Sequence, residues 1–363
     1  MQVIETYCID YHFFSKFSKC TLTSIDYTSD WILPISVSHK NCYTDAITPI
    51  YKINAIPTID NWKNGVLCIC NHEFFSEATL DELIEKIYSV KEINNIPTNK
   101  IYILCRNIHN HKNIRSILVL DCMNYLKNKF MSVMRDSDYT HISYKRMLYL
   151  NWHIEDRSIS RIFLPLLLAK YNLMKHINLS LQGRGDNLFY KFPHYADSRM
   201  IKAVKMLRSD SKINFNQIHD VIIDFENKSD IHIVQCAYTS LTASYNHHFI
   251  CEKVLRPIMD KKLFILIGTP GILEQVRSMG FLTFSNLFDE NYDTIKDELD
   301  RHTAIFKLIK MFHNLNDKEL NELISKAKYI IDFNYYHMLY LLDQEIQNIN
   351  NLVKDNNDSY YNT

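Results

Sequence analysis

Residues 263–280 read LFILIGTPGILEQVRSMG, and this stretch decides the fold class. Its first five residues, Leu263–Ile267, are all apolar and predict a buried strand. The glycines and proline of residues 268–271 then predict a turn into a helix, which ends at Gly280 because proline favours helix starts and glycine helix ends. Phe281–Phe284 predicts the next strand. A strand, a helix and a strand in this order are typical of a parallel α/β unit.

The same alternation recurs on both sides of this stretch. Further strands are predicted at Val66–Cys70, Ile101–Cys105, Met147–Leu150, Val221–Phe225 and Ile231–Val234. One helix is expected to begin near Thr79, and another after Ser158, with Pro165 as a kink or break. The tail from residue 294 to about residue 353 predicts two or three helices with polar faces. Both halves of the chain therefore read as α/β.

Composition limits the kind of protein further. A length of 363 residues suits two domains, and 47% apolar with 23% charged residues is typical of a soluble globular protein. The 41 basic and 41 acidic residues cancel, which argues against a strongly basic surface for nucleic acid. Only 6 residues are glycine, and none forms the glycine-rich loop of a dinucleotide or P-loop site. Nucleotide sites built on those loops are excluded.

The cysteines and the apolar runs indicate the cellular compartment of the protein. Nine cysteines without a C-x-x-C pair favour a reduced interior, and Cys68 and Cys70 are expected to be core residues rather than metal ligands. The longest apolar run, Ile162–Ala169, is far shorter than the roughly 18 residues of a membrane span. The first ten residues lack the pattern of a signal peptide. We therefore expect a cytoplasmic protein without a membrane span, in the host cytoplasm if the chain is viral.

Residues 249–258, FICEKVLRPI, carry the strongest functional signal. Glu252 and Lys253 are expected at the start of a short helix, where the helix dipole attracts anions. Lys253 and Arg256 would reinforce that attraction toward a diphosphate, and the carboxylate of Glu252 suits hydrogen bonds from a sugar hydroxyl. The alternative is an exposed Glu-Lys pair on a solvated helix.

Four ordered segments extend this signal to a family resemblance. They read FICEK with RPI in residues 249–258, GTPGIL in 268–273, VRSMGFLTF in 276–284 and DENYD in 289–293. In this order they resemble the C-terminal domain of bacteriophage-type GT-B glycosyltransferases. The Glu-Lys element is also similar to that of fucosyltransferases, in which it lies against the nucleotide-sugar donor.

A weaker match lies upstream, in residues 147–168. There the resemblance adds Asn151 and Arg157 to the donor site, and leaves Arg161 as either a further basic contact or a surface residue. The chain departs from the family at Trp152 and His153, where the family tends to have arginine, and in lacking a glutamate near residue 236.

The resemblance implies an α/β fold of the GT-B type, in which two Rossmann-like domains face each other across a cleft and C-terminal helices follow. It assigns residues 1–140 to an acceptor-side domain and residues 141–310 to a nucleotide-sugar-binding domain. Residues 311–355 become helices that pack back on the N-terminal domain, and residues 356–363 a disordered tail. The donor-binding residues implied are Glu252, Lys253, Arg157, Asn151, Arg256, Gly268 and Thr269. The resemblance implies no cofactor and no obligatory metal, because the nucleotide-sugar is a substrate.

Glycosyl transfer also needs a group that takes a proton from the acceptor hydroxyl. His72 and Glu73 follow the predicted strand Val66–Cys70 and are the candidate catalytic residues, with a helix-capping role as the alternative. His109 and His111 follow the next strand in the same way and rank behind them. The D-x-D pattern of residues 136–138 suits a metal-dependent donor site, but an exposed acidic loop is favoured.

These observations lead to one hypothesis with open alternatives. The chain is expected to move a sugar from a nucleotide-sugar to an acceptor hydroxyl, with a hydroxymethylated pyrimidine in phage DNA as one acceptor and a surface glycan as another. The basic residues between 127 and 146 suit either a DNA backbone or a solvated face. The third reading is a degenerate GT-B protein that binds a nucleotide or nucleic acid without transfer. Sugar, nucleotide, stereochemistry and oligomeric state stay open.

Overall fold

A computed structural model describes the chain in segments. They are residues 2–4, 18–20, 24–29, 31–36, 59, 62–70, 96–97, 100–105, 115–118, 146–152, 160–182, 198–210, 213, 229–236 and 252–358. The chain forms two compact units. Unit 1 comprises residues 1–129, 244–246 and 339–363, and unit 2 comprises residues 130–243 and 247–338. The predicted helix near Thr79 and strand Val221–Phe225 lie outside the described residues.

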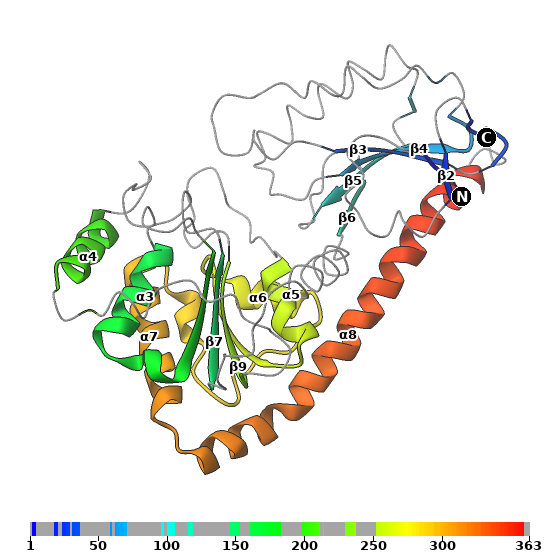
Figure 1. The fold of residues 1–363 in the computed structure, drawn as a ribbon. Helices are drawn as coiled ribbons and strands as arrows, with labels where there is room; N and C mark the ends of the chain where they lie inside the picture. Colours follow the sequence, from blue (N-terminus) through cyan, green and yellow to red (C-terminus); the bar gives the residue numbers. More distant parts are fainter. Residues whose placement is uncertain are drawn as a thin grey trace, which may run out of the picture. The chain divides into compact units, whose positions relative to one another are not determined.

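Unit 1 is built on a parallel sheet of six described strands (Figure 1). The strands are β1 (Gln2–Ile4), β2 (Ser18–Cys20), β3 (Trp31–Ser36), β4 (Gly65–Cys70), β5 (Ile101–Cys105) and β6 (Arg115–Leu118), in the order β2-β1-β3-β4-β5-β6. Strands β4 and β5 confirm two of the sequence predictions. Every described pairing in this sheet is parallel, as expected of an α/β unit.

The core of unit 1 centres on Trp31. Its ring is fully buried and lies 5.0 Å from that of Trp62. A Cβ atom at Gly65 would come within 1.9 Å of the Trp31 ring, so only glycine fits there. Cys68 is buried as a free thiol, and burial raises its pKa to about 12. For Cys68 the prediction of a core cysteine is confirmed.

Unit 2 contains a second parallel sheet, of four described strands. The strands are β7 (Met147–Trp152), β8 (Ile177–Gln182), β9 (Ile231–Gln235) and β10 (Leu263–Ile267), in the order β10-β9-β7-β8. All five residues of both β9 and β10 are buried, which is typical of a parallel sheet covered on both faces. Strands β7, β9 and β10 confirm three predictions. With two parallel sheets, the α/β fold class is confirmed.

Helices cover the sheet of unit 2 on both sides (Figure 1). They are α3 (Ser160–Lys170), α4 (Ser198–Ser209), α5 (Glu252–Met259), α6 (Ile272–Ser278) and α7 (Glu298–Asn314), with the short 3₁₀ helices η5 (Leu173–His176) and η8 (Asn291–Thr294). Helices α3, α4 and α7 pack together, whereas α5 packs on β9 and β10. The predicted helices after Ser158 and in residues 272–279 are confirmed, with Pro165 inside α3.

The C-terminal helix α8 (Asp317–Asp358) contributes to both units. Its residues up to Met338 are part of unit 2, and those from Leu339 onward are part of unit 1. Together α7 and α8 confirm the prediction of two helices in the tail. The helix also includes residues 356–358, which the sequence assigned to a disordered tail, while residues 359–363 lie outside the described part of the chain. None of the described helices is long and apolar enough to cross a bilayer.

The predicted strand Phe281–Phe284 is wrong. Both phenylalanines are buried as expected, and Phe284 packs on Phe264 of β10 with 4.9 Å between ring centroids. The backbone, however, bonds to side chains instead of a neighbouring strand. Asn334 of α8 accepts from the Leu282 N–H at 2.7 Å and donates to the Leu282 carbonyl at 2.8 Å. These side-chain bonds replace the ladder that an additional strand would have formed.

Candidate functional site

The strand order of unit 2 locates a candidate ligand site at the carboxyl ends of β7 and β9. These neighbouring strands lie at the centre of the sheet. The chain leaves β7 through α3 toward β8 on one side, and leaves β9 through α5 toward β10 on the other. Open α/β sheets bind ligands where successive connections diverge in this way, just outside the carboxyl ends of the strands. We call this place the switch point.

A buried polar cluster lies beneath the switch point. The Tyr149 hydroxyl of β7 donates a hydrogen bond to Oε1 of Gln235, the last residue of β9. Nη2 of Arg161 in α3 donates to the Cys236 carbonyl at 3.1 Å. Burial raises the pKa of Tyr149 well above its usual range, and the nearby charge of Arg161 partly opposes that rise. Tyr149 is therefore a neutral donor.

The sequence left open whether Arg161 is a basic contact or a surface residue. Arg161 is only 1% exposed, so the reading of Arg161 as a surface residue is wrong. A cationic side chain lies instead below the edge where a ligand is expected. Sequence reasoning did not find Tyr149 and Gln235, because both stand inside apolar runs that indicate only a buried strand.

The first turn of α5 holds the two residues of the Glu-Lys motif. Glu252 is the first residue of this helix and Lys253 the second, as predicted. Because α5 connects β9 to β10 in a parallel sheet, its N-terminus lies at the carboxyl edge, beside the switch point. The positive end of the helix dipole therefore points toward the candidate site. That both residues bind a donor stays a prediction.

Arg256 lies one turn further along α5 and has a partner within the protein. Its Nε donates to Oδ2 of Asp260 at 2.8 Å, and both side chains are largely buried. Asp260 lies 3.9 Å from Nδ1 of His232, the second residue of β9, which places the pair toward the amino ends of the strands. Burial lowers the pKa of His232 well below its ordinary value, so this contact involves a neutral ring and is no ion pair. The geometry favours a structural role for Arg256, and its donor contact stays a prediction.

Gly268 and Thr269 form the turn between β10 and α6. A Cβ atom at Gly268 would lie 3.1 Å from the Ile272 side chain, so glycine allows α6 to approach closely. Thr269 is buried, and its carbonyl accepts from the Ile272 N–H at 3.1 Å. The N-terminus of α6 is already capped, because Oδ2 of Asp293 accepts from the Leu273 N–H at 3.1 Å. Donor binding by Gly268 and Thr269 stays a prediction.

The DENYD motif of residues 289–293 also makes structural contacts. Oε1 of Glu290 accepts from the Phe284 N–H at 2.8 Å, and Oε2 lies 3.3 Å from Nη1 of Arg277. Burial raises the pKa of Glu290, although these contacts oppose the rise. Tyr292 is buried, and Asp293 caps α6. The motif thus holds the loop between α6 and α7 in place. Its described contacts are structural.

Helix α7 begins at the same edge of the sheet. Phe163 near the start of α3 packs on His302 near the start of α7, with 6.2 Å between ring centroids, and Tyr171 just after α3 packs on Phe306 at 5.1 Å. The two helices therefore run in the same direction. Since α3 leaves the carboxyl end of β7, the N-terminus of α7 also lies at the carboxyl edge.

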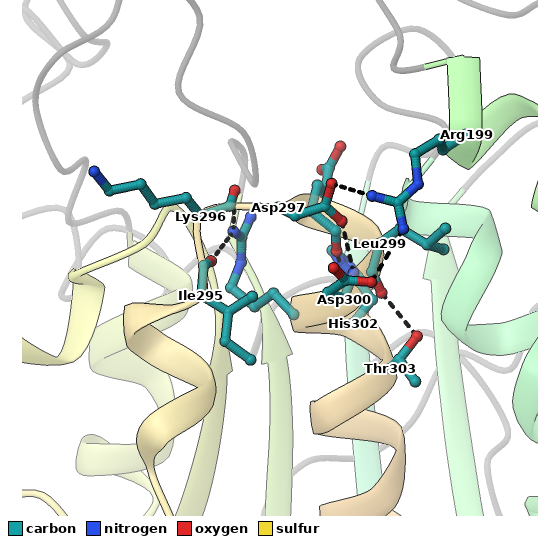
Figure 2. Close-up of polar contacts among 10 residues, drawn as sticks. Arg199, Ile295, Lys296, Asp297, Leu299, Asp300, His302 and Thr303 are labelled. Carbon is teal, nitrogen blue, oxygen red and sulfur yellow. Dashed lines mark hydrogen bonds and ion pairs between the residues drawn. The ribbon is translucent and has the colours of Figure 1, made fainter.

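An ionic network ties α4 to the start of α7 (Figure 2). Arg199 of α4 donates to Oδ2 of Asp297 at 2.7 Å and to Oδ1 of Asp300 at 3.2 Å. Asp297 also caps α7 by accepting from the Asp300 N–H at 2.9 Å. Nearby, buried Arg301 donates to the carbonyls of Ile295 and Lys296 at 2.7 and 3.2 Å. Arg199 is paired with the two aspartates, and Arg301 is bound to backbone carbonyls, so we assign the network to structure. The D-x-x-D spacing of the cap was readable from the sequence.

The remaining predicted site residues lie largely beyond the described segments. His72, Glu73, Arg157, the histidines at 109 and 111 and the D-x-D pattern of residues 136–138 are all outside them. Asn151 belongs to β7, next to its carboxyl end. Within the described residues, no three His, Cys, Asp or Glu side chains gather into a group that could hold a metal ion.

No protein-family model matches the chain, and no curated protein matches it. Similar solved structures include a trehalose-6-phosphate synthase studied with bisubstrate glycomimetics, with 10% identity, a TM-score of 0.40, and coverage of 90% of this chain and 75% of that one. The N-terminal domain of the Candida albicans trehalose-6-phosphate phosphatase has 10% identity and a TM-score of 0.37, covering 86% of this chain and 69% of the other.

A third similar structure is an α,α-trehalose-phosphate synthase (UDP-forming) from Burkholderia xenovorans, in complex with glucose-6-phosphate. It has 9% identity and a TM-score of 0.39, and the match covers 90% of this chain and 73% of that one. Likenesses this remote carry no inference about substrate or reaction. The fold class of this chain rests on its own two parallel sheets.

Proposed function

We propose that the chain is a GT-B glycosyltransferase that moves a sugar from a nucleotide-sugar to an acceptor hydroxyl. One observation carries the proposal: Glu252 and Lys253 begin a helix whose N-terminus lies beside the switch point of the sheet in unit 2. The motif that resembles the donor element of known glycosyltransferases thus coincides with the edge where an α/β sheet binds its ligand.

The chemistry follows from what each group can do. In the proposed reaction the acceptor oxygen bonds to the anomeric carbon, while the bond from that carbon to the diphosphate oxygen breaks. His72 or Glu73 takes the proton of the acceptor hydroxyl. The helix dipole of α5, Lys253 and Arg157 neutralise the departing diphosphate, and Glu252 accepts hydrogen bonds from the sugar. The buried charge of Arg161 adds positive potential under this edge. The proposed mechanism requires no metal.

The acceptor divides the proposal into two branches. The resemblance to bacteriophage-type glycosyltransferases suggests a hydroxymethylated pyrimidine in DNA or a surface glycan. A net charge of zero does not favour DNA over glycan. The two acceptors are therefore separate arms of one experiment.

The test measures release of nucleoside diphosphate or monophosphate from UDP-, GDP-, CMP- and dTDP-sugars. Each donor is tried with hydroxymethylated DNA, with a glycan and with neither, in the presence and absence of EDTA. We expect Glu252→Gln to lower kcat/KM roughly 30-fold, because a lost hydrogen bond to a charged group is worth about 2 kcal/mol. The matched control is Glu274→Gln, which changes an exposed glutamate in the first turn of α6. Equal activity of the two variants would contradict the assignment.

A second candidate function is binding of a nucleotide-sugar without transfer. It is favoured by two departures from the family pattern: Trp152 and His153 stand where the family tends to have arginine, and no glutamate lies near residue 236. Isothermal titration of the same donors separates the two functions. Donor binding that Glu252→Gln weakens, with no release under any condition, supports the binding protein. Donor binding together with release supports the enzyme.

A further inference from the structure

Two histidines meet at the amino edge of the sheet in unit 2, opposite the edge that carries the switch point. His176 is the last residue of η5 and directly precedes β8, and His313 lies in the last turn of α7. Their ring centroids are 4.7 Å apart, and the rings meet edge to face. Both side chains are half-buried. We call these two residues the histidine pair.

Arg146 lies at the same edge, directly before β7, and ties the loop between α7 and α8 to the sheet. Its Nη1 donates to the carbonyl of Leu315. Its Nη2 lies 2.6 Å from Oδ1 of Asp317, the first residue of α8. One guanidinium thus holds the segment in which α7 ends and α8 begins. We call this segment, residues 314–317, the corner.

The charges around the histidine pair are mostly positive. Three neighbours oppose a proton on His176, and one favours it. The opposing neighbours are His313, Arg146 and Lys175, and the favourable one is Asp317. Burial, followed by these positive neighbours, lowers the pKa of His176 below its ordinary value of 6.5. Asp317 compensates little, because its side chain is 89% exposed and its charge is screened by water.

Two further acids stand on the neighbouring segments. Glu319 belongs to the first turn of α8, where its Oε2 accepts from the Asn316 N–H at 2.8 Å. Asp230 directly precedes β9, and its backbone N–H donates to the Arg146 carbonyl at 3.0 Å. Both residues therefore take part in the hydrogen bonds that hold the corner and the strand beside it.

These contacts couple proton uptake to the position of the corner. With the corner closed, two imidazolium rings would stand against each other and close to the charge of Arg146. Nε2 of His313 is buried and has no hydrogen-bond partner among the described residues. Opening the corner would hydrate both rings and separate the charges, so the open state would bind a proton at His176 more readily. Acid therefore favours opening, by at most about tenfold per pH unit for each proton taken up.

We propose that the histidine pair is a proton-sensitive latch, which holds the start of α8 at neutral pH and releases it in mild acid. Histidine suits this role because its ordinary titration falls between about pH 5 and 8. The released element is a helix that contributes to both compact units. The proposal is independent of the proposed activity, because the latch and the switch point lie at opposite edges of the sheet.

The first test follows hydrogen exchange at the start of α8. Its reporters are the N–H groups of Glu319 and Leu320, which bond to Oδ1 and to the carbonyl of Asn316. After correction for the intrinsic effect of pH, their protection should fall at least about threefold between about pH 7.5 and about pH 5.5. It should also stay below that of Ile233 in the central strand β9, which reports unfolding of the whole unit. Unchanged protection at α8, or protection equal to that of Ile233 in acid, would overturn the latch.

Variants of the pair separate the latch from other effects of acid on α8. His176→Gln and His313→Gln each remove one titrating ring, and each should remove most of the acid-induced loss of protection at Leu320. Glu319→Gln is the matched control, because it removes the carboxylate that caps the same turn and should leave the loss in place. Circular dichroism checks that each variant is folded. If Glu319→Gln abolished the loss while the histidine variants kept it, the helix cap would be the sensor and the proposal would be wrong.

The second test measures the titration of His176 itself, by NMR of its ring protons. His313→Gln should raise the pKa of His176, because a repelling neighbour is lost. Asp317→Asn should lower that pKa, because the favourable carboxylate is lost. Asp332→Asn is the control, since Asp332 lies on the same helix but pairs with Lys328. A titration of His176 that neither His313→Gln nor Asp317→Asn moves would overturn the proposal.

Discussion

At the scale of single residues, the carboxylate of Asp293 closes the turn around α6. Its Oδ2 accepts from the Leu273 N–H, and its own carbonyl accepts from the Gly271 N–H at 2.8 Å. Gly271 has φ of +86°, a conformation that favours glycine. Both the bonds to Asp293 and the glycine therefore stabilise this turn. One buried acid, distant in sequence, thus satisfies donors on both sides of the helix start.

We therefore expect Asp293→Ala to lower the free energy of unfolding by about 1 to 2 kcal/mol, the cost of losing a helix cap. Asp293→Asn keeps an acceptor oxygen and should cost less. Urea unfolding followed by circular dichroism measures both. Asp289→Ala is the control, since Asp289 is exposed and accepts a local hydrogen bond from the Asn291 N–H. If the alanine variants of Asp289 and Asp293 were equally stable, Asp293 would not be the cap that holds this turn.

The candidate site was only partly predictable at this scale. Glu252 and Lys253 stand at the helix start where the sequence put them, because helix ends are local features. The bond between Tyr149 and Gln235 joins residues 86 positions apart, and no local pattern encodes such a pair. Arg256 illustrates the opposite case. Its partner Asp260 is only four residues away, but the choice between a ligand and an internal partner depends on burial.

At the scale of secondary structure, Asn334 takes the place of a missing strand. Its side chain bonds both backbone groups of Leu282 and is itself 1% exposed. Replacing it with alanine leaves two backbone groups unpaired, each of which costs about 1 to 3 kcal/mol when buried. We expect Asn334→Ala to lower the free energy of unfolding by about 2 to 3 kcal/mol. The same urea titration tests this, with Asn321→Ala on the exposed face of α8 as control.

A loss for Asn334→Ala no larger than that for Asn321→Ala would contradict this account. Hydrogen exchange adds a second readout, because the Leu282 N–H should exchange faster in Asn334→Ala. Exchange there should stay unchanged in the control variant.

Elements were predictable where their residues are uniformly apolar. Runs such as Leu263–Ile267 gave correct strands because a strand buried on both faces has no polar positions. Strand β8 reads INLSLQ, and its polar Asn178 is buried. Because polar residues interrupt the apolar run, its sequence does not predict a core strand. Phe281–Phe284 failed for the converse reason. Its residues are as apolar as those of a strand, but its backbone bonds to side chains: to Asn334 of α8, 52 residues after Leu282, and to Glu290 in the following loop.

At the scale of the whole molecule, stability should fall in mild acid. Burial lowers the pKa of both His232 and His302, which belong to unit 2, so both rings are neutral in the fold. An unfolded histidine takes up its proton near the ordinary pKa of 6.5. Below that pH the unfolded state binds more protons than the folded state, and stability therefore decreases as pH falls. Each histidine contributes at most about 1.4 kcal/mol per pH unit.

Urea unfolding at about pH 7.5 and about pH 5.5, at one ionic strength, measures this slope. We expect unit 2 to be the more acid-labile part, which hydrogen exchange at the two pH values would show. His302→Gln should reduce the slope, because the amide does not titrate. A free energy of unfolding that is the same at both pH values would contradict the assignment of buried neutral histidines.

The sequence also predicted two α/β halves, since both contain alternating strands and helices. Local patterns did not show that unit 1 combines residues from both ends of the chain, because membership in a unit depends on contacts between residues far apart. Only the family resemblance implied that residues 311–355 pack back on the N-terminal domain. Composition does not shift at Met338, where α8 passes from one unit to the other. Because α8 is continuous there, no linker sequence marks the boundary between the units.

This shared helix has a consequence for biosynthesis. The ribosome makes the strands of unit 1 before it makes unit 2, but it makes the portion of α8 that belongs to unit 1 after unit 2. Unit 2 is complete in the nascent chain before unit 1 is, although it comes later in the message. A stop codon between residues 339 and 358 would therefore remove part of unit 1, although the strands of unit 1 are encoded before unit 2.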